Sequence, residues 1–185
     1  MGSANAILLV LLLTVSAGCG NMTDDLIPSG SDKRPDVTPG TTGPFPGQIA
    51  PDFTVPDMFG NSVTLSSAIT TTGVQGVVFY FTMWCPICWD HMDNIVNVQM
   101  PAFPTVRFYA VDYVNGTIAD VQQSAINSGY GGTPLTILAD TQNTVENLYQ
   151  GTMGTTVVVD RNGIVRMNED YKDGARLQNV LSHLP

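Results

Sequence analysis

The chain has 185 residues, which is enough for one ordinary domain with appendages but too few for two full-sized domains. Its 7 Lys and Arg against 16 Asp and Glu give a formal net charge of −9, which argues against a nucleic-acid surface and against a polybasic grip on anionic lipid. Charged residues make up 12% and hydrophobic residues 43%, so composition predicts one acidic folded domain rather than a disordered chain. Three Cys are too few for a disulfide-dense scaffold.

The N-terminal segment has the features of an export signal. Residues 7–13 form an unbroken aliphatic run, far shorter than the ~20 residues of a membrane-spanning helix. The Ala17-Gly18-Cys19 junction that follows resembles the lipobox of bacterial lipoproteins, whose cysteine is lipidated and becomes the mature N-terminus. This resemblance predicts a lipoprotein-type signal peptide at residues 1–18 and a membrane anchor through a lipid on Cys19. The protein would then be exported to the bacterial cell envelope and face the periplasm or the exterior. An ordinary cleaved signal and an uncleaved anchor are the alternatives.

Composition divides the rest of the chain into two parts. Residues 19–46 are dominated by Gly, Pro, Ser, Thr and Asp, and such a stretch buries too little apolar surface to offset its ordering entropy. We therefore predict a flexible tether that holds the domain off a membrane surface. Residues 47–185 carry the apolar patterns of a folded domain, which at this length buries roughly two-thirds of its unfolded surface.

The predicted elements of this domain alternate between strand and helix. A continuously apolar and aromatic run at 76–83 predicts a central strand covered on both faces, and a helix with apolar side chains at helical spacing begins at Pro86. The other strands are predicted at 52–55, 62–65, 106–113, 135–139, 155–160 and 164–167, and the other helices at 117–128, 141–150 and 173–184. This order predicts an α/β fold with a central mixed sheet flanked by helices and an N-terminal β extension.

The most informative segment is Trp84-Cys85-Pro86-Ile87-Cys88, at the end of the central strand. Pro86 suits the first position of a helix, where its missing N–H needs no partner. Cys85 then faces the free N–H groups of the helix start, which favour its thiolate and predict a lowered pKa. Cys88 is close enough in the chain to attack a mixed disulfide on Cys85, and Trp84 shields one side of the pair. The segment therefore predicts dithiol redox chemistry.

Two other interpretations of the cysteines fit the sequence less well. A structural zinc ion needs four ligands, whereas the remaining Cys is Cys19 and the histidines are His91 and His183. An inert disulfide is rarely this short, and rarely lies at a strand-to-helix junction. A redox-active disulfide between Cys85 and Cys88 needs no bound metal or organic cofactor, and we expect none.

A family resemblance supports this interpretation. The Trp-Cys-Pro-Ile-Cys segment resembles the active site of the thioredoxin superfamily. Together with residues 50–53 (APDF), 60–65 (GNSVTL), 138–140 (LAD) and 155–163 (TTVVVDRNG), it resembles exported, membrane-anchored thiol–disulfide oxidoreductases related to the alkyl hydroperoxide reductase/thiol-specific antioxidant (redoxin) family. The resemblance covers about residues 47–184. It implies a thioredoxin-like fold, Cys85 as the nucleophile, Cys88 as the resolving cysteine, and protein thiol or disulfide substrates served by an electron donor or acceptor.

Three positions depart from that pattern. Gly154 stands where the family has a cis-proline, just before Thr155 and next to the cysteine pair, so we expect the Met153–Gly154 peptide bond to be trans. Gly154→Pro is then expected to change the reduction potential or substrate turnover while leaving the fold intact. Phe79 replaces the buried acid of thioredoxins, so the proton acceptor for Cys88 is not evident. Thr82 matches a threonine of peroxiredoxins, but Val78 stands where their proline would be.

Neighbouring side chains have simpler interpretations. His91 lies one turn beyond Cys88 and could relay a proton, although a polar residue at the edge of an amphipathic helix is the simpler alternative. Trp89 and Tyr80 are predicted to lie in the core, and Met83 is interpreted as a packing residue.

Thiol–disulfide exchange with exported proteins is therefore the function that the sequence favours. The first alternative is peroxide reduction, with Cys85 oxidised to a sulfenic acid that Cys88 resolves. The second is a copper-handling chaperone that binds Cu(I) through both thiolates and a histidine, against which the spacing of the cysteines argues. The direction of exchange, reductive or oxidative, stays open.

Overall fold

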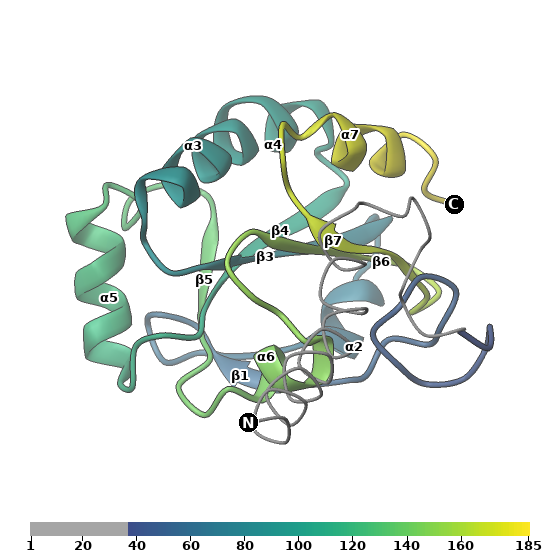
Figure 1. Cartoon of the computed structure of the whole chain (residues 1–185), viewed down its shortest axis with the longest axis horizontal. Coiled ribbons are helices and arrows are strands. Elements are labelled where there is room, and N and C mark those ends of the chain that lie inside the picture. Colours follow the sequence, from purple (N-terminus) through teal and green to yellow (C-terminus); the bar gives the residue numbers. More distant parts are fainter. Residues whose placement is uncertain (1–36) are drawn as a thin grey trace, which may run out of the picture. The chain divides into compact units, whose positions relative to one another are not determined.

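The computed structural model describes residues 37–185. The predicted signal peptide, Cys19 and most of the predicted tether lie outside the described residues. A five-stranded sheet with the order β5-β4-β3-β6-β7 forms the centre of the domain (Figure 1). Its strands are β3 (Gly76–Thr82), β4 (Val106–Asp112), β5 (Thr136–Ala139), β6 (Thr155–Asp160) and β7 (Val165–Asp170). β3, β4 and β5 are parallel, whereas β6 and β7 run antiparallel to their neighbours. The predicted α/β fold with a mixed sheet is confirmed.

The predicted N-terminal β extension is also present. β1 (Thr54–Pro56) and β2 (Ser62–Thr64) form an antiparallel pair. The turn between them is held by the Asp57 carboxylate, whose Oδ1 accepts from the Phe59 N–H at 2.9 Å and from the Asn61 N–H at 2.9 Å. An isolated bridge from Asp57 to Leu138 of β5 attaches this extension to the edge of the main sheet.

Helices cover both faces of the sheet (Figure 1). On one face lie α3 (Pro86–Asn94), the π-helix η1 (Ile95–Gln99), α4 (Met100–Ala102) and α7 (Ala175–Leu181), and α5 (Ile118–Asn127) packs beside β5. On the other face lie α2 (Leu65–Ile69) and α6 (Thr144–Tyr149). The sequence did not predict α2, because its apolar residues are too few to show a helical period. The π-turn precedes Pro101, whose missing N–H cannot continue the regular helical ladder.

The alternation of side chains along β3 gives the domain two separate apolar clusters. Every residue of β3 is buried. Val78 and Tyr80 belong to the cluster under α3 and α7, together with Cys88. Phe79 and Phe81 belong to the cluster on the opposite face, with the N-terminal extension and α6.

The folded part of the chain begins earlier than predicted. The Gly43 N–H donates to the Ile49 carbonyl at 3.0 Å, and the Asn168 side chain donates to the Pro44 carbonyl at 3.0 Å. Residues 40–46 therefore bond to the domain, so ordered structure extends several residues before the boundary expected at residue 47. Their Gly and Pro content favoured the prediction of a flexible tether, but these residues form a turn whose backbone groups bond to the domain. Within residues 37–185, none of the helices has the length and apolarity needed to cross a bilayer.

Candidate active site

The cysteine pair lies where β3 passes into α3, as the sequence predicted. Cys85 is the N-cap of α3, in an extended conformation, and Pro86 occupies the first helical turn. Trp84 has a positive φ of 61°, which is unusual for a bulky residue. The Thr82 hydroxyl accepts from the Trp84 N–H at 3.1 Å, and the Trp84 indole N–H donates to Asp112 at 2.7 Å. These two bonds hold the strained turn that presents Cys85 at the helix start.

The two sulfur atoms are adjacent but differ in accessibility. The distance between the Sγ atoms of Cys85 and Cys88 is 2.9 Å, and the Cys88 N–H donates to the Cys85 Sγ at 3.3 Å. Cys85 is partly exposed, whereas Cys88 is fully buried; both are free thiols. A disulfide on another molecule can therefore reach Cys85 but not Cys88.

The acidities of the two thiols differ from the prediction. Burial and the Cys88 thiol raise the pKa of Cys85, although backbone N–H groups at the start of α3 act in the opposite direction. Burial also opposes ionisation of Cys88, but hydrogen bonds from the Cys85 thiol and from the backbone outweigh it and lower the pKa of Cys88. The predicted lowering of the Cys85 pKa is thus wrong for the reduced pair, because adjacent sulfurs share one proton. The contact between the two sulfurs therefore shifts their pKa values in opposite directions.

The loop before β6 lies beside the pair. The Gly154 N–H donates to the Phe81 carbonyl at 3.0 Å, with a φ of +86° at Gly154. The Met153–Gly154 peptide bond is trans, as predicted. The contact with the active cysteine comes from Met153, whose Sδ lies 3.4 Å from the Cys85 Sγ. Thr155 is buried, and its hydroxyl accepts from the Thr152 N–H at 3.0 Å, so it stabilises the loop.

Two consequences follow for the sequence-based expectations. Met153 was missed, although its position next to the glycine that replaces the family's proline could have identified it. The geometry also overturns the expectation that Gly154→Pro leaves the fold intact. Proline has no N–H to give to Phe81 and cannot adopt a positive φ.

Behind Cys88 lies a second group of polar side chains. The Tyr80 hydroxyl forms a hydrogen bond with the His91 Nδ1 at 3.0 Å. Tyr80 and Cys88 lie in the same buried cluster, where hydrogen bonding by Tyr80 contributes to the lowered pKa of Cys88. The His91 ring also stacks on Tyr171, with ring centroids 4.7 Å apart. Burial raises the pKa of Tyr80 and lowers the pKa of His91, so both side chains are neutral at pH 7. Tyr80 lies in the core, as predicted, but its hydroxyl connects the core to the active site.

Exposed apolar side chains flank the cysteine motif in the sequence, and Met153 joins them through its contact with Cys85. Four large residues close to the motif in sequence or space are exposed: Met83 by 45%, Ile87 by 55%, Trp89 by 40% and Met153 by 38%. The interpretations of Trp89 as a core residue and of Met83 as a packing residue are therefore wrong. Trp89 points to solvent because the buried side of α3 is taken by Cys88 and Met92, and Met83 lies in the connection between β3 and α3. We name these four residues the apolar collar.

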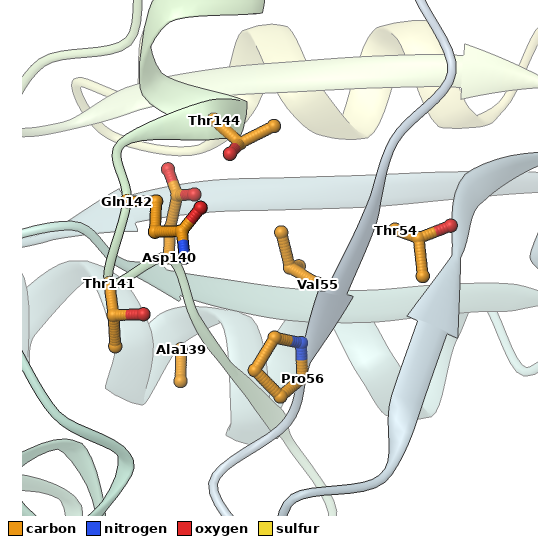
Figure 2. Close-up of a pocket in the computed structure, with 8 residues that line it drawn as sticks. All are labelled: Thr54, Val55, Pro56, Ala139, Asp140, Thr141, Gln142 and Thr144. Atoms are coloured by element: carbon orange, nitrogen blue, oxygen red, sulfur yellow. The ribbon is translucent and has the colours of Figure 1, made fainter.

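A pocket of about 190 Å³ lies elsewhere in the domain, between β1 and the segment that follows β5 (Figure 2). Val55 and Pro56 form one wall, and Asp140, Gln142 and Thr144 project from the other. The Asp140 carboxylate accepts from the backbone N–H groups of Val145 and Glu146, so it serves as a cap of α6. None of the residues that line this pocket belongs to the cysteine site.

The fold and the paired thiols define a redox protein of the thioredoxin superfamily. Residues 46–168 match the AhpC/TSA family. The chain therefore belongs to that family, and it is an oxidoreductase. Among curated proteins, none matches the chain.

Solved structures of similar fold include both kinds of thiol enzyme considered above. MTB dsbF, described in mixed oxidised and reduced forms, has a TM-score of 0.58 and 21% identity, over 72% of this chain and 95% of its own. A secreted Mycobacterium tuberculosis disulfide oxidoreductase homologous to E. coli DsbE has a TM-score of 0.55 and 18% identity, over 71% of this chain and 96% of its own. The peroxidoxin BcpB from Mycobacterium tuberculosis has a TM-score of 0.57 and 19% identity, over 74% and 94%. At these identities the likeness establishes the fold.

Proposed function

We propose that this protein is a thiol–disulfide oxidoreductase that exchanges disulfides with exported protein substrates through Cys85 and Cys88. The observation that carries the proposal is the pair itself. One sulfur is accessible, the other is buried 2.9 Å away, and both lie at the start of α3. An exchange enzyme needs this asymmetry, because one thiol must meet the partner and the other must release it.

The reaction proceeds through two displacements at sulfur. The Cys85 sulfur attacks the partner's disulfide as a thiolate, while the proton that the two adjacent sulfurs share stays on Cys88. One partner sulfur leaves as a thiolate, and the other stays in a mixed disulfide with Cys85. Cys88 then loses its proton and attacks the Cys85 sulfur, which releases the second partner thiolate. The Cys85–Cys88 dithiol has given two electrons to the substrate and has itself become a disulfide. The same steps in reverse oxidise a dithiol substrate.

The apolar collar favours polypeptides as substrates over small thiols. When exposed Met, Ile and Trp side chains cover apolar segments of a partner, binding is favoured by about 25 cal/mol per Å² of apolar surface buried. Methionine adapts its shape to different partners because its side chain is flexible. An electron donor or acceptor must restore the pair after each turnover, and it would use the same accessible sulfur.

We also propose that the protein is exported and anchored to the bacterial cell envelope through a lipid on Cys19. The aliphatic run at residues 7–13 and the Ala17-Gly18-Cys19 junction support this. A single acyl chain gives only marginal membrane binding, so stable anchoring requires further chains. Intact-mass spectrometry of membrane-extracted protein is expected to show the loss of residues 1–18 and an added lipid mass. A soluble form that starts at another residue would refute the anchor.

Cys88→Ser tests the exchange function directly. Without the resolving sulfur, the mixed disulfide between Cys85 and its protein partner should accumulate and survive non-reducing electrophoresis. Cys85→Ser is the matched control and should trap nothing, because Cys88 is buried. Peroxide should oxidise Cys85 no faster than an ordinary thiolate. A rate orders of magnitude above that reference, together with no trapped partner, would replace exchange by peroxide reduction.

A further inference from the structure

We infer that Tyr80 and His91 form the proton relay that activates Cys88, a role that rests on the proposed exchange function. The exchange mechanism leaves Cys88 protonated inside the mixed disulfide, because Cys88 keeps the proton that the two sulfurs shared. Only the thiolate attacks a disulfide at a useful rate. Cys88 is fully buried, so bulk water does not reach its proton, and Phe79 stands at the position where thioredoxins carry a buried acid.

The geometry provides a path for that proton. The Tyr80 hydroxyl forms a hydrogen bond with the His91 Nδ1 at 3.0 Å, and Tyr80 and Cys88 lie in the same buried cluster. In the relay the same hydroxyl serves the Cys88 thiol, in line with the effect of each group on the pKa of the other. His91 also makes a hydrogen bond to the backbone of Lys172, whose carbonyl can only accept. The relay uses the His91 tautomer that carries its hydrogen on Nε2, which leaves Nδ1 with a lone pair facing the Tyr80 hydroxyl.

The transfer balances without a tyrosinate. The Cys88 S–H gives its proton to the Tyr80 oxygen, while the Tyr80 O–H gives its own proton to the His91 Nδ1. Afterwards the Tyr80 hydroxyl donates to the Cys88 thiolate, and the His91 imidazolium donates to the Tyr80 oxygen. Each hydrogen bond is kept, with its donor and acceptor exchanged. Tyr80 stays neutral throughout, in line with the upward shift of its pKa. The half-buried His91 then releases the proton to water or to the departing thiolate.

The groups around His91 fit a base of this kind. Tyr80 faces it from β3, Asp90 precedes it on α3, and Asp170, Tyr171 and Lys172 face it from the end of β7. The two carboxylates stabilise an imidazolium, whereas burial destabilises it more strongly, so the pKa of His91 is lowered. The resting ring is therefore neutral, yet a transient positive charge has two nearby acids to stabilise it. Tyr80 touches the reacting sulfur and is a catalytic residue, and His91 acts through it as a positioning residue.

The test separates the two displacements with a bis(nitrobenzoate) disulfide, whose leaving thiolate absorbs visible light. Rapid mixing with the reduced full-length protein should show a first release as Cys85 attacks and a second release as Cys88 attacks. In Tyr80→Phe the second release should slow by at least about tenfold, because general-base assistance is removed. The first release should change by less than about threefold.

His91→Asn keeps a side chain that can hydrogen-bond the Tyr80 hydroxyl but cannot accept its proton. Here too the second release should slow at least about tenfold, and its rate should lose the fall that the wild-type protein shows as the pH drops through the pKa of His91. The exposed His183 gives a matched control, because His183→Asn should change neither phase nor the pH profile.

Each failure has a distinct meaning. If the second release keeps its rate and pH profile in Tyr80→Phe and His91→Asn, the relay is wrong, whereas the exchange function stands. An equal slowing of both releases would also overturn the relay, because it would indicate a structural defect. If the wild-type protein gives no first release, or releases no second thiolate, the proposed exchange function itself fails.

Discussion

Phe79 and Tyr80 are adjacent in β3 but lie on opposite faces of the sheet, and the two faces have different roles. On one face, the Phe79 ring lies 5.7 Å from that of Phe53 and 4.7 Å from that of Tyr149, in edge-to-face contacts typical of a stabilising core. On the other face, Tyr80 extends a hydroxyl to Cys88 and His91. Because successive side chains of a strand point to opposite faces, the domain can keep a dry core and a proton path in one strand.

The largest expected effect tests this division directly. Phe79→Ala should lower the free energy of unfolding by about 3–5 kcal/mol, because it leaves a cavity among packed rings. Tyr80→Phe should lower it by less, about 1–2 kcal/mol, because the variant loses the hydrogen bonds of the hydroxyl but keeps the packed ring. Urea unfolding of the reduced proteins measures both. In buffer where both variants are folded, Phe79→Ala should keep the ratio between the rates of the first and second thiolate release. Tyr80→Phe should change that ratio, because it slows the second release. Equal losses of stability would show that the two faces do not differ in this way.

The next effect concerns the loop that fastens the site to the end of β3. Gly154→Pro should cost about 3 kcal/mol or more, because proline removes the N–H that binds Phe81 and cannot adopt the φ of +86°. In Gly154→Ala the new Cβ meets no atom within 4 Å, so only the left-handed backbone is penalised, by about 1 kcal/mol. Thermal unfolding should rank the wild-type protein above Gly154→Ala and Gly154→Ala above Gly154→Pro. A proline variant as stable as the wild-type protein would refute this loop geometry.

A smaller effect distinguishes the accessible sulfur from the buried one. Met153→Lys places an ammonium group near the Cys85 Sγ and should lower the pKa of Cys85 by about one unit or less, since the site is partly exposed. The pH dependence of alkylation by iodoacetamide reports this pKa. Met153→Gln is the control, because it is polar without a charge and should leave the profile close to that of the wild-type protein. An upward shift in the lysine variant would contradict the contact between Met153 and Cys85.

The smallest expected effect is a pH dependence of the free energy of unfolding that comes from His91. Burial lowers the pKa of His91 below 6.5, so the unfolded chain binds a proton at a higher pH than the folded chain does. Stability should therefore fall as the pH drops through 6.5, and level off below the folded pKa. His91→Asn should flatten this part of the urea-midpoint profile, and the exposed His183→Asn should not. A stability that rises as the pH drops through this range, and loses that rise in His91→Asn, would show that His91 is charged in the fold.

The sequence by itself determined the fold class and the position of the cysteine pair. The buried run of β3, the proline after Cys85 and the alternation of strand and helix are local patterns, and local patterns follow from backbone geometry and side-chain periodicity. The N-terminal extension and the trans peptide bond before Gly154 were predictable for the same reason. The short helix α2 and the bonded turn at residues 40–46 were not, because neither carries a periodic apolar pattern.

The tertiary structure alone decided the chemistry around the two sulfurs. Met153 meets Cys85 only because β6 pairs with β3, and no local pattern records that pairing. The buried tyrosine became a hydrogen-bond partner of Cys88 only when α3 packed over β3. The order of acidity of the two thiols depends on their mutual contact and on how deeply each is buried. These are properties of distance and solvent exclusion, which arise when segments far apart in the chain pack together.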